Sequence, residues 1–327
     1  MSNNKLFLQV NDLRVDYVTR AQTVHAVNGV SFTLEKGKTL GLVGETGAGK
    51  TTIARAIMRV LQTPPAVLKS GEVILDGKRL LELSEEEMCG IRGSWVTMIF
   101  QDPMTSLNPV MSIGSQIAEV IEQHVSTNKA QVRTRACEML ELVGIPKERY
   151  DEFPHQFSGG MKQRVVIAIA LACHPDLLLA DEPTTALDVT IQAQVLELMR
   201  NLRKETHTST ILITHDLGVV AEMCDEVAIV YAGEIVEIGS REDLFDHPTH
   251  PYTIGLFGAI PQLDSDVEWL SPVEGMPPDP TNLPTGCKFH PRCPYATDEC
   301  RVNDVELREL SPKHLCRCIH LQKEGQA

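Results

Sequence analysis

The chain has 327 residues, 43% of them hydrophobic and 23% charged, with a net charge of −14, which suits one large domain or two smaller ones. The acidic balance excludes general nucleic-acid binding, which needs a basic surface to displace the counterions of phosphate. The sequence lacks both an apolar run near the roughly 20 residues of a membrane span and the apolar core of a secretory signal, so we expect a cytoplasmic chain that meets a membrane only through a partner protein.

The first 240 residues alternate short apolar runs with stretches of helical periodicity. An apolar run that stops at glycine or a polar residue is typical of a strand buried on both faces of a parallel sheet, and the alternation predicts a doubly wound α/β fold. The predicted strands are Leu6–Val10, Asp12–Tyr17, Val30–Leu34, Thr39–Val43, Val73–Leu75, Val96–Phe100, Leu177–Ala180, Thr210–Ile213 and Val227–Val230. The predicted helices are Thr51–Leu61, Ile113–Gln123, Ala130–Val143, Met161–Ala172, Thr190–Arg203 and Gly218–Cys224.

A glycine-rich segment lies between a predicted strand and a predicted helix, which is the context of a phosphate-binding loop, or P-loop. Its glycines let successive backbone N–H groups face one concavity, and the helix N-terminus favours an anion there. Lys50 can reach the β- and γ-phosphates, and the Thr51 hydroxyl can bind Mg²⁺. The predicted nucleotide-binding residues of this loop are Gly44, Glu45, Thr46, Gly47, Ala48, Gly49, Lys50, Thr51 and Thr52.

Two adjacent carboxylates, Asp181 and Glu182, follow the apolar run Leu177–Ala180. A strand of an open α/β sheet would deliver them to its carboxyl end, where ligands of such folds bind. We expect Asp181 to hold Mg²⁺ through its water shell. We expect Glu182 to polarise the water that attacks the γ-phosphorus.

Further motifs resemble those of the ATP-binding-cassette (ABC) ATPases. The segment Phe157-Ser158-Gly159-Gly160-Met161 resembles the family's signature motif, with Met161 in place of the usual glutamine. The other matches are Gln101 with the Q-loop glutamine, Ala186-Leu187-Asp188 with the D-loop, His215 with the switch histidine, and Tyr17 with the aromatic residue that stacks on adenine.

This resemblance implies a role for each motif. Gln101 would contact Mg²⁺ and the attacking water, and His215 would donate to the γ-phosphate. The signature residues Ser158, Gly159 and Gly160 would bind the γ-phosphate held by the P-loop of a second subunit, because a helix start with free N–H groups is an anion site.

Longer stretches resemble the ATPase subunits of oligopeptide and dipeptide importers, namely residues 99–109, 154–161, 181–190, 250–253 and 284–294. The resemblance implies a P-loop ATPase core with a mostly parallel sheet, an N-terminal antiparallel β part and a helical subdomain at about 103–165. We expect the nucleotide-binding domain to span residues 1–240. Residues 241–327 would form a loop-rich C-terminal extension, since 11 of the 19 prolines lie there.

The resemblance further implies a function and partners. The chain would bind and hydrolyse ATP as one of two different ATPase subunits beneath two membrane-spanning permease subunits, at the cytoplasmic face of the membrane. An extracytoplasmic peptide-binding protein would supply the substrate. Uptake of nickel, glutathione or antimicrobial peptides is the alternative within importers.

ABC ATPases outside transport are a further alternative. Chromosome and DNA-repair members insert hundreds of coiled-coil residues between the P-loop and the signature. Here Lys50 and Ser158 are 108 positions apart, so the sequence favours a transport ATPase.

Five of the nine cysteines crowd into the extension: Cys287, Cys293, Cys300, Cys316 and Cys318. In a cytosolic chain such crowding indicates metal binding before disulfides. The set Cys287, Cys293, Cys300 and Cys318 resembles the pattern that binds a [4Fe–4S] cluster in peptide-importer ATPases, whose ligands are thiolates.

Two alternatives remain for these cysteines. Cys316 could replace Cys318 as the fourth ligand, and zinc could replace the cluster, with His290 or His314 as further ligands. Either metal would cross-link loops. Because a cluster on this loop-rich segment would lie far along the chain from the P-loop, we expect the role of the cluster to be structural.

Overall fold

The computed structural model describes residues 6–102, 106–125, 128–185, 188–259 and 273–320. These residues divide into two compact units. The P-loop unit comprises residues 6–34, 39–81 and 214–320, and the helical unit comprises residues 35–38 and 82–213.

The N-terminal strands of the P-loop unit form a four-stranded sheet in the order β2-β1-β4-β5. The strands are β1 (Leu6–Val18), β2 (Thr23–Glu35), β4 (Ala66–Leu75) and β5 (Lys78–Arg79). Strand β1 runs antiparallel to β4, with Leu8 opposite Leu75 and Tyr17 opposite Ala66. Apolar residues such as Leu8 and Val10 alternate toward the interior and are fully buried. The expected antiparallel β part at the N-terminus is therefore confirmed.

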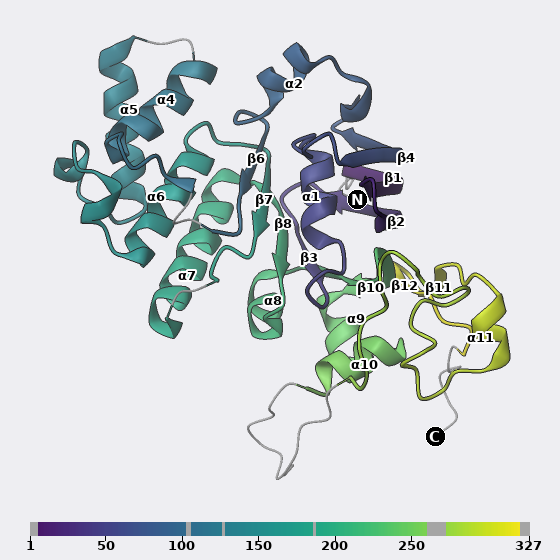
Figure 1. The fold of residues 1–327 in the computed structure, drawn as a ribbon. Helices are drawn as coiled ribbons and strands as arrows, with labels where there is room; N and C mark the ends of the chain where they lie inside the picture. The colour runs from purple at the N-terminus through teal and green to yellow at the C-terminus, as the bar shows by residue number, and fades with distance from the viewer. Residues whose placement is uncertain (1–5, 103–105, 126–127, 186–187, 260–272, 321–327) are drawn as a thin grey trace. The chain divides into compact units, whose positions relative to one another are not determined.

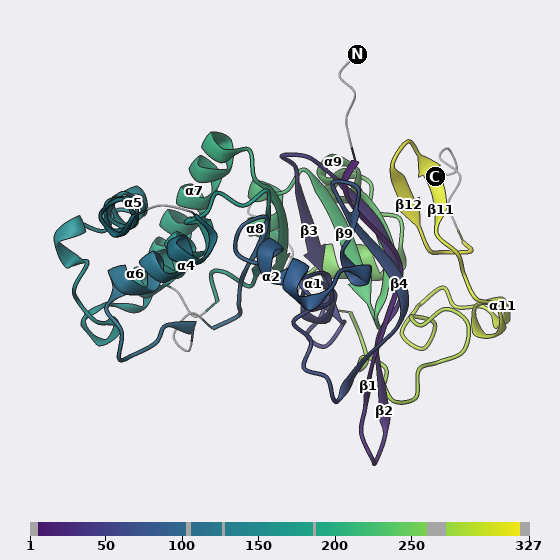
Figure 2. The same ribbon diagram turned by 90° about the horizontal axis from the view of Figure 1, so that it is seen from above.

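A second set of strands in the P-loop unit carries the phosphate-binding loop. All five residues of β3 (Thr39–Val43) are buried, and β3 runs parallel to β9 (Glu226–Tyr231). Strand β9 pairs antiparallel with β10 (Glu234–Ser240), and β10 pairs with β12 (His314–Cys316). The C-terminal extension thus adds β12 and its partner β11 (Arg308–Ser311) to this sheet, and Figure 2 shows these two strands side by side.

The helices of the P-loop unit are α1 (Lys50–Ile57), α8 (Leu217–Met223), α9 (Arg241–Asp246), α10 (Pro251–Phe257) and α11 (Asp298–Val302). The last three belong to the extension, where short helices alternate with irregular segments (Figure 1).

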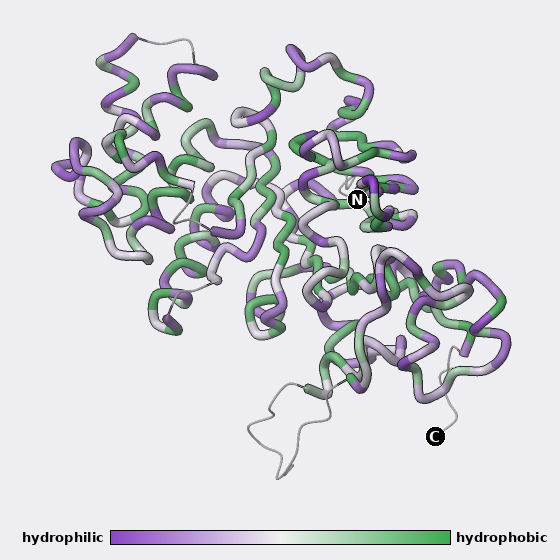
Figure 3. The backbone as a smooth tube through the Cα atoms, in the orientation of Figure 1, coloured by the Kyte–Doolittle hydropathy of each residue, from purple (hydrophilic) through white to green (hydrophobic). Residues whose placement is uncertain are grey.

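The described residues of the helical unit include three parallel strands, with β7 between the other two. Strand β7 (Leu177–Asp181) pairs with β6 (Val96–Ile99) on one side and with β8 (Ser209–Thr214) on the other. Every residue of these strands is buried, and hydrophobic residues follow one another along them in Figure 3. Both faces of this sheet are therefore covered, as the uninterrupted apolar runs indicated.

Five α-helices complete the described part of this unit: α2 (Glu85–Ile91), α4 (Ile113–His124), α5 (Lys129–Leu142), α6 (Gly159–Leu171) and α7 (Val189–Thr206). The helices α4, α5 and α6 pack on one another. Side chains at Ser112, Asn128 and Asp188 accept hydrogen bonds from the first turns of α4, α5 and α7. These caps explain where the helices begin.

The predicted elements are present, and the α/β fold class is confirmed. The two predicted strands Leu6–Val10 and Asp12–Tyr17 form one strand, because the register with β4 shifts between Asn11 and Arg14 without ending β1. The first helix ends at Ile57, four residues earlier than predicted, and Arg59 beyond it has a φ of 53°.

The predicted domain boundary at residue 240 and the helical subdomain at about 103–165 stay predictions, and residues 103–105 lie outside the described part of the chain. No helix in that part is long and apolar enough to span a membrane.

Candidate active site

The loop of residues 44–49 joins β3 to α1 in the P-loop unit. A Cβ atom at Gly44 would lie 2.1 Å from the carbonyl oxygen of Val230, and one at Gly49 would lie 2.3 Å from that of Ala26. Both positions therefore require glycine, because neighbouring backbone occupies the space of a side chain. This close packing holds the loop in a tight turn at the start of α1.

The Lys50 side chain lies against the loop at which it is predicted to bind phosphates. Its side-chain ammonium donates hydrogen bonds to the carbonyl oxygens of Gly44, at 2.7 Å, and Glu45, at 2.9 Å. The residue is only 6% exposed. A phosphate oxygen is a stronger partner for an ammonium group than a neutral carbonyl, so the arrangement favours an anion at this loop.

Tyr17 also lies beside the predicted nucleotide-binding residues. Its hydroxyl is 3.2 Å from the hydroxyl oxygen of Thr52 in the first turn of α1. The structure therefore brings together β1 and the start of α1, two predicted parts of one binding site.

The catalytic carboxylates lie at the end of β7 in the helical unit. Asp181 is fully buried, and Glu182 follows it with a φ of 48°. The backbone N–H of Glu182 donates to the carbonyl of Ile213 over 2.8 Å. Such a left-handed conformation is costly for a residue with a side chain and occurs often at functional sites.

The Glu182 carboxylate receives two side-chain hydrogen bonds at one oxygen. The Gln101 amide donates to Oε2 over 3.0 Å, and the Thr185 hydroxyl donates to the same atom over 2.9 Å. Gln101 and Glu182 are 81 positions apart in the chain. The structure thus brings the predicted base and the predicted Q-loop glutamine together.

The signature residues form the start of α6 in the same unit. Ser158 caps the helix by accepting a hydrogen bond from the N–H of Met161 over 3.4 Å. Ser158 and Gly159 are exposed, and a Cβ atom at Gly160 would lie 2.4 Å from Cγ2 of Ile191. Glycine at position 160 therefore lets α6 approach the start of α7.

Asp188 and His215 complete the set of predicted residues. Asp188 is exposed and caps α7 through the N–H of Ile191, 2.9 Å away, whereas Ala186 and Leu187 lie outside the described residues. His215 is exposed and lies between β8 and α8 in the P-loop unit. The predicted catalytic residues are therefore distributed over both units.

The extension supplies residues at the P-loop that the sequence analysis missed. The Tyr252 hydroxyl accepts a hydrogen bond from the N–H of Glu45 over 3.0 Å, and Arg292 forms an ion pair with the Glu45 carboxylate at 2.8 Å. Two residues of the extension thus contact the P-loop, although they follow Glu45 by 207 and 247 positions in the chain. Both residues lie in stretches that resembled peptide-importer ATPases, but no local pattern linked them to Glu45.

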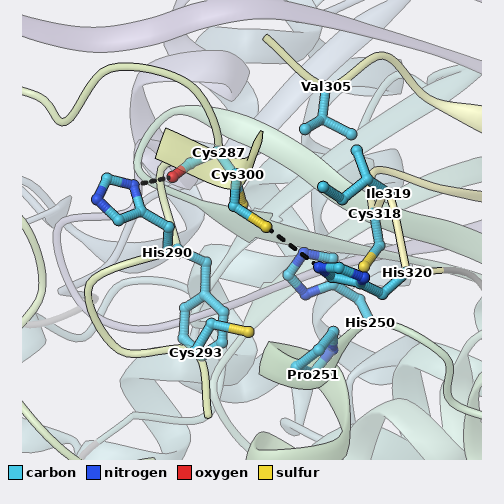
Figure 4. Close-up of a pocket in the computed structure, with 11 residues that line it drawn as sticks. His250, Pro251, Cys287, His290, Cys293, Cys300, Val305, Cys318, Ile319 and His320 are labelled. Carbon is cyan, nitrogen blue, oxygen red and sulfur yellow. Dashed lines mark hydrogen bonds between the residues drawn. The ribbon is translucent and has the colours of Figure 1, made fainter. Parts of the chain in front are cut away.

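The four cysteines of the predicted set line one pocket in the extension (Figure 4). The pocket is lined by His250, Pro251, Cys287, Phe289, His290, Cys293, Cys300, Val305, Cys318, Ile319 and His320. The Cys300 sulfur lies 3.4 Å from Nε2 of His320. Cys316 is buried in β12 and is not among the lining residues. Across the described ranges, no group of three or more Cys, His, Asp or Glu side chains is arranged to hold a metal ion.

Burial favours the protonated form of three of these thiols. The pKa values of Cys287, Cys293 and Cys318 are raised, primarily because burial disfavours the thiolate form. Metals bind the thiolate, so a cation in this pocket would have to displace the protons. The donor types fit a thiolate-bound metal, whereas the arrangement of the side chains does not form a ready site.

Comparison with known proteins gives two family matches. The family described as "ABC transporter" matches residues 27–185, and the one described as "Oligopeptide/dipeptide transporter, C-terminal region" matches residues 236–300.

Curated relatives match most of the chain. The chain is 54% identical to an oligopeptide transport ATP-binding protein of Bacillus subtilis, over 88% of this chain and 82% of the relative. It is 52% identical to a dipeptide transport ATP-binding protein of the same organism, over 90% and 88% of the two chains. An oligopeptide transport ATP-binding protein of Salmonella typhimurium is 48% identical, over 96% and 93%.

A solved structure has a similar fold. A dimeric ATP-binding cassette, in a post-hydrolysis state with ADP and Pi, aligns with a TM-score of 0.64 at 25% identity. The alignment covers 72% of this chain and 98% of that chain.

Proposed function

Because the chain belongs to the ABC transporter ATPases and carries the oligopeptide/dipeptide transporter C-terminal region, we propose that it is the ATP-hydrolysing subunit of a peptide importer. The observation that carries this proposal is the Lys50 ammonium held over a glycine loop at a strand–helix junction. The substrate class follows from the relatives, whose names specify oligopeptide and dipeptide transport.

The residues of the P-loop unit would bind the nucleotide. Lys50 and the backbone N–H groups of the loop would bind the phosphates, and Thr51 would help to hold Mg²⁺, which offsets the phosphate charge when it is bound. Tyr17 would stack on adenine, and His215 would donate to the γ-phosphate.

The residues of the helical unit would carry the chemistry. Asp181 would hold Mg²⁺ through water, and Glu182 would accept a proton from the attacking water. Gln101 donates a hydrogen bond to the Glu182 carboxylate and would orient it toward that water. The γ-phosphate then leaves as inorganic phosphate, with ADP as the second product.

The partners follow from the exposed signature. Ser158 and Gly159 are exposed at the start of α6, which supports their action on the nucleotide of a second ATPase subunit. The assembly would include two membrane-spanning permease subunits and an extracytoplasmic peptide-binding protein. This chain would lie at the cytoplasmic face of the membrane as a peripheral subunit.

Uptake assays test the substrate class. Deletion of this chain from cells that contain it should abolish ATP-dependent uptake of labelled di- and oligopeptides, and the intact chain should restore it. Nickel and glutathione uptake should be unchanged, because another ATPase would drive each. Normal peptide uptake with loss of nickel or glutathione uptake would assign the chain to the alternative class.

We also propose that Cys287, Cys293, Cys300 and Cys318 bind a [4Fe–4S] cluster, with zinc as the alternative metal. What supports this proposal is that all four sulfurs belong to residues lining one pocket, which Cys316 does not line. Thiolates are the ligands that such clusters require. The bound metal would cross-link segments of the extension that have little regular structure.

Metal analysis of the full chain tests this proposal. Protein purified without oxygen should be brown and contain about four irons per chain. Cys293→Ser should lower the iron content strongly, whereas Cys316→Ser should retain it, because that thiol lies outside the pocket. Iron loss in Cys316→Ser would contradict the choice of Cys318. A colourless protein with one zinc would replace the cluster by a tetrahedral zinc site.

A further inference from the structure

Arg292 of the extension is almost completely buried at the P-loop, with a side chain that is 4% exposed. Its two terminal nitrogens donate to both oxygens of the Glu45 carboxylate, at 2.8 and 3.0 Å. The same nitrogens donate to the Tyr231 hydroxyl at 3.4 Å and the Val273 carbonyl at 3.1 Å, and Nε donates to the Glu274 carbonyl at 2.8 Å. All five N–H groups of the guanidinium are thus used.

Glu45 is held at each of its polar groups. Its N–H donates to the Tyr252 hydroxyl, its carbonyl accepts from Lys50 at 2.9 Å, and its carboxylate is paired with Arg292. Tyr252 and Arg292 are 207 and 247 positions away along the chain. Two side chains of the extension therefore act together with Lys50 to hold the P-loop at this residue.

Tyr252 is itself fixed by an aromatic cluster. It is fully buried, and its ring centroid lies 4.6 Å from that of Tyr231 and 5.4 Å from that of Phe289. Burial raises the pKa of Tyr252, so the hydroxyl stays neutral. A neutral, immobilised hydroxyl can accept from the Glu45 N–H without adding negative charge to the loop.

The ion pair between Arg292 and Glu45 also affects the net charge of the P-loop. Glu45 lies next to Gly44, whose carbonyl accepts from Lys50, and its carboxylate is a negative group on a loop that binds a strongly anionic ligand. An unpaired carboxylate there would repel the phosphates. Arg292 neutralises it with a guanidinium that is almost completely buried, against a Glu45 side chain that is 28% exposed.

We propose that Arg292 and Tyr252 are positioning residues for ATP, which hold and neutralise Glu45 so that the P-loop is preorganised for the phosphates. This inference rests on the proposed nucleotide-binding function of the P-loop. The extension then contributes directly to nucleotide affinity, through residues that do not contact the nucleotide themselves.

Titration of the full chain with Mg-ATP tests the inference. Arg292→Ala should raise the Kd for ATP by roughly tenfold, within the ~5–150-fold range of coupling between sites. Arg292→Lys should have an intermediate Kd, since an ammonium keeps the charge but cannot form the two parallel bonds of the guanidinium. In the assembled transporter, Arg292→Ala should raise KM for ATP more than it lowers kcat.

A double variant tests whether Arg292 acts by neutralising the Glu45 carboxylate or only by stabilising the local structure. Glu45→Gln combined with Arg292→Ala should bind ATP more tightly than Arg292→Ala alone, because the unpaired carboxylate has been removed. A purely structural role of Arg292 gives equal or weaker binding in the double variant, which would overturn the charge argument. The departure from additivity measures the coupling between the two side chains.

Two further variants keep the test independent of folding. Tyr252→Phe removes only the hydroxyl and retains the ring contacts, and it should weaken ATP binding by a smaller factor. The matched control is Arg301→Ala, since Arg301 is an exposed arginine of the same segment, 3.8 Å from Asp298, and its loss should leave the Kd unchanged. Thermal unfolding of each variant without nucleotide identifies any that does not fold.

The outcome for Lys50→Ala distinguishes failure of the positioning role from failure of the proposed nucleotide-binding site. If Lys50→Ala loses ATP binding while folded Arg292→Ala and Tyr252→Phe bind ATP normally, the positioning role is excluded and the P-loop assignment stands. If Lys50→Ala binds ATP normally, the proposed nucleotide site itself is wrong.

Discussion

Glu182→Gln should bind ATP but hydrolyse it roughly 10²- to 10⁴-fold more slowly, because a glutamine cannot accept the proton of the attacking water. The carbonyl oxygen of the glutamine can still accept the hydrogen bonds that Gln101 and Thr185 donate to Oε2 of Glu182. The turn after β7 should therefore keep its conformation. The rate loss would then report the missing base rather than a distorted site.

Single-turnover release of phosphate from the assembled transporter measures this effect. The equivalent base of the partner ATPase subunit must be inactivated too, so that only the site of this chain contributes. Thr185→Val is the matched control, since it removes one hydrogen bond to the same oxygen and leaves the carboxylate. It should slow hydrolysis much less. Near-normal hydrolysis by Glu182→Gln at this site would exclude Glu182 as the base.

The buried strands were predictable because burial on both faces leaves a continuous apolar run in the sequence. Strands β3 and β7 are entirely buried, and each was predicted within one residue of its observed bounds. Strands β11 and β12 were not predicted. Strand β12 pairs with β10 and contributes His314, whose ring nitrogen lies 2.9 Å from the fully buried Glu237 carboxylate. Such long-range pairing has no local signal, because strand formation depends on its partners.

The candidate active site was also predictable from the sequence only in part. The P-loop and the carboxylate pair are contiguous motifs, so residue type and spacing were enough to predict them. The left-handed turn at Glu182 and its contact with Gln101 depend on how separate segments pack, and no spacing rule contains them. The Arg292–Glu45 pair is the extreme case, since both residues were part of recognised stretches whose contact only the tertiary structure reveals.

Lys50→Ala should lose most of its affinity for ATP. Removing one partner of a buried charge pair costs about 2–5 kcal/mol, which corresponds to a roughly 30-fold to several-thousandfold weaker Kd. Lys50 meets this condition because it is 6% exposed and its ammonium lies on the concave loop. Without it, the phosphates would face the carbonyl oxygens of Gly44 and Glu45, which repel an anion.

The loss can be measured in two ways on the full chain. In a direct titration with Mg-ATP, Lys50→Ala and Lys50→Met should both bind weakly. Because methionine keeps most of the aliphatic stem, equal losses would assign the effect to the charge. In thermal unfolding, ATP at about 100 times the Kd stabilises the folded chain by about 2.7 kcal/mol, and both variants should lack this stabilisation.

Lys36→Ala is the matched control for this prediction. Its ammonium lies 3.0 Å from Asp176, and its side chain is 56% exposed. An exposed ion pair contributes about 0–1 kcal/mol to stability, so the variant should unfold near the temperature of the intact chain and keep the full stabilisation by ATP. If Lys50→Ala behaved like Lys36→Ala in both measurements, the loop after β3 would not be the phosphate-binding site. Loss of stabilisation in Lys50→Ala alone would locate the phosphates of ATP at this loop.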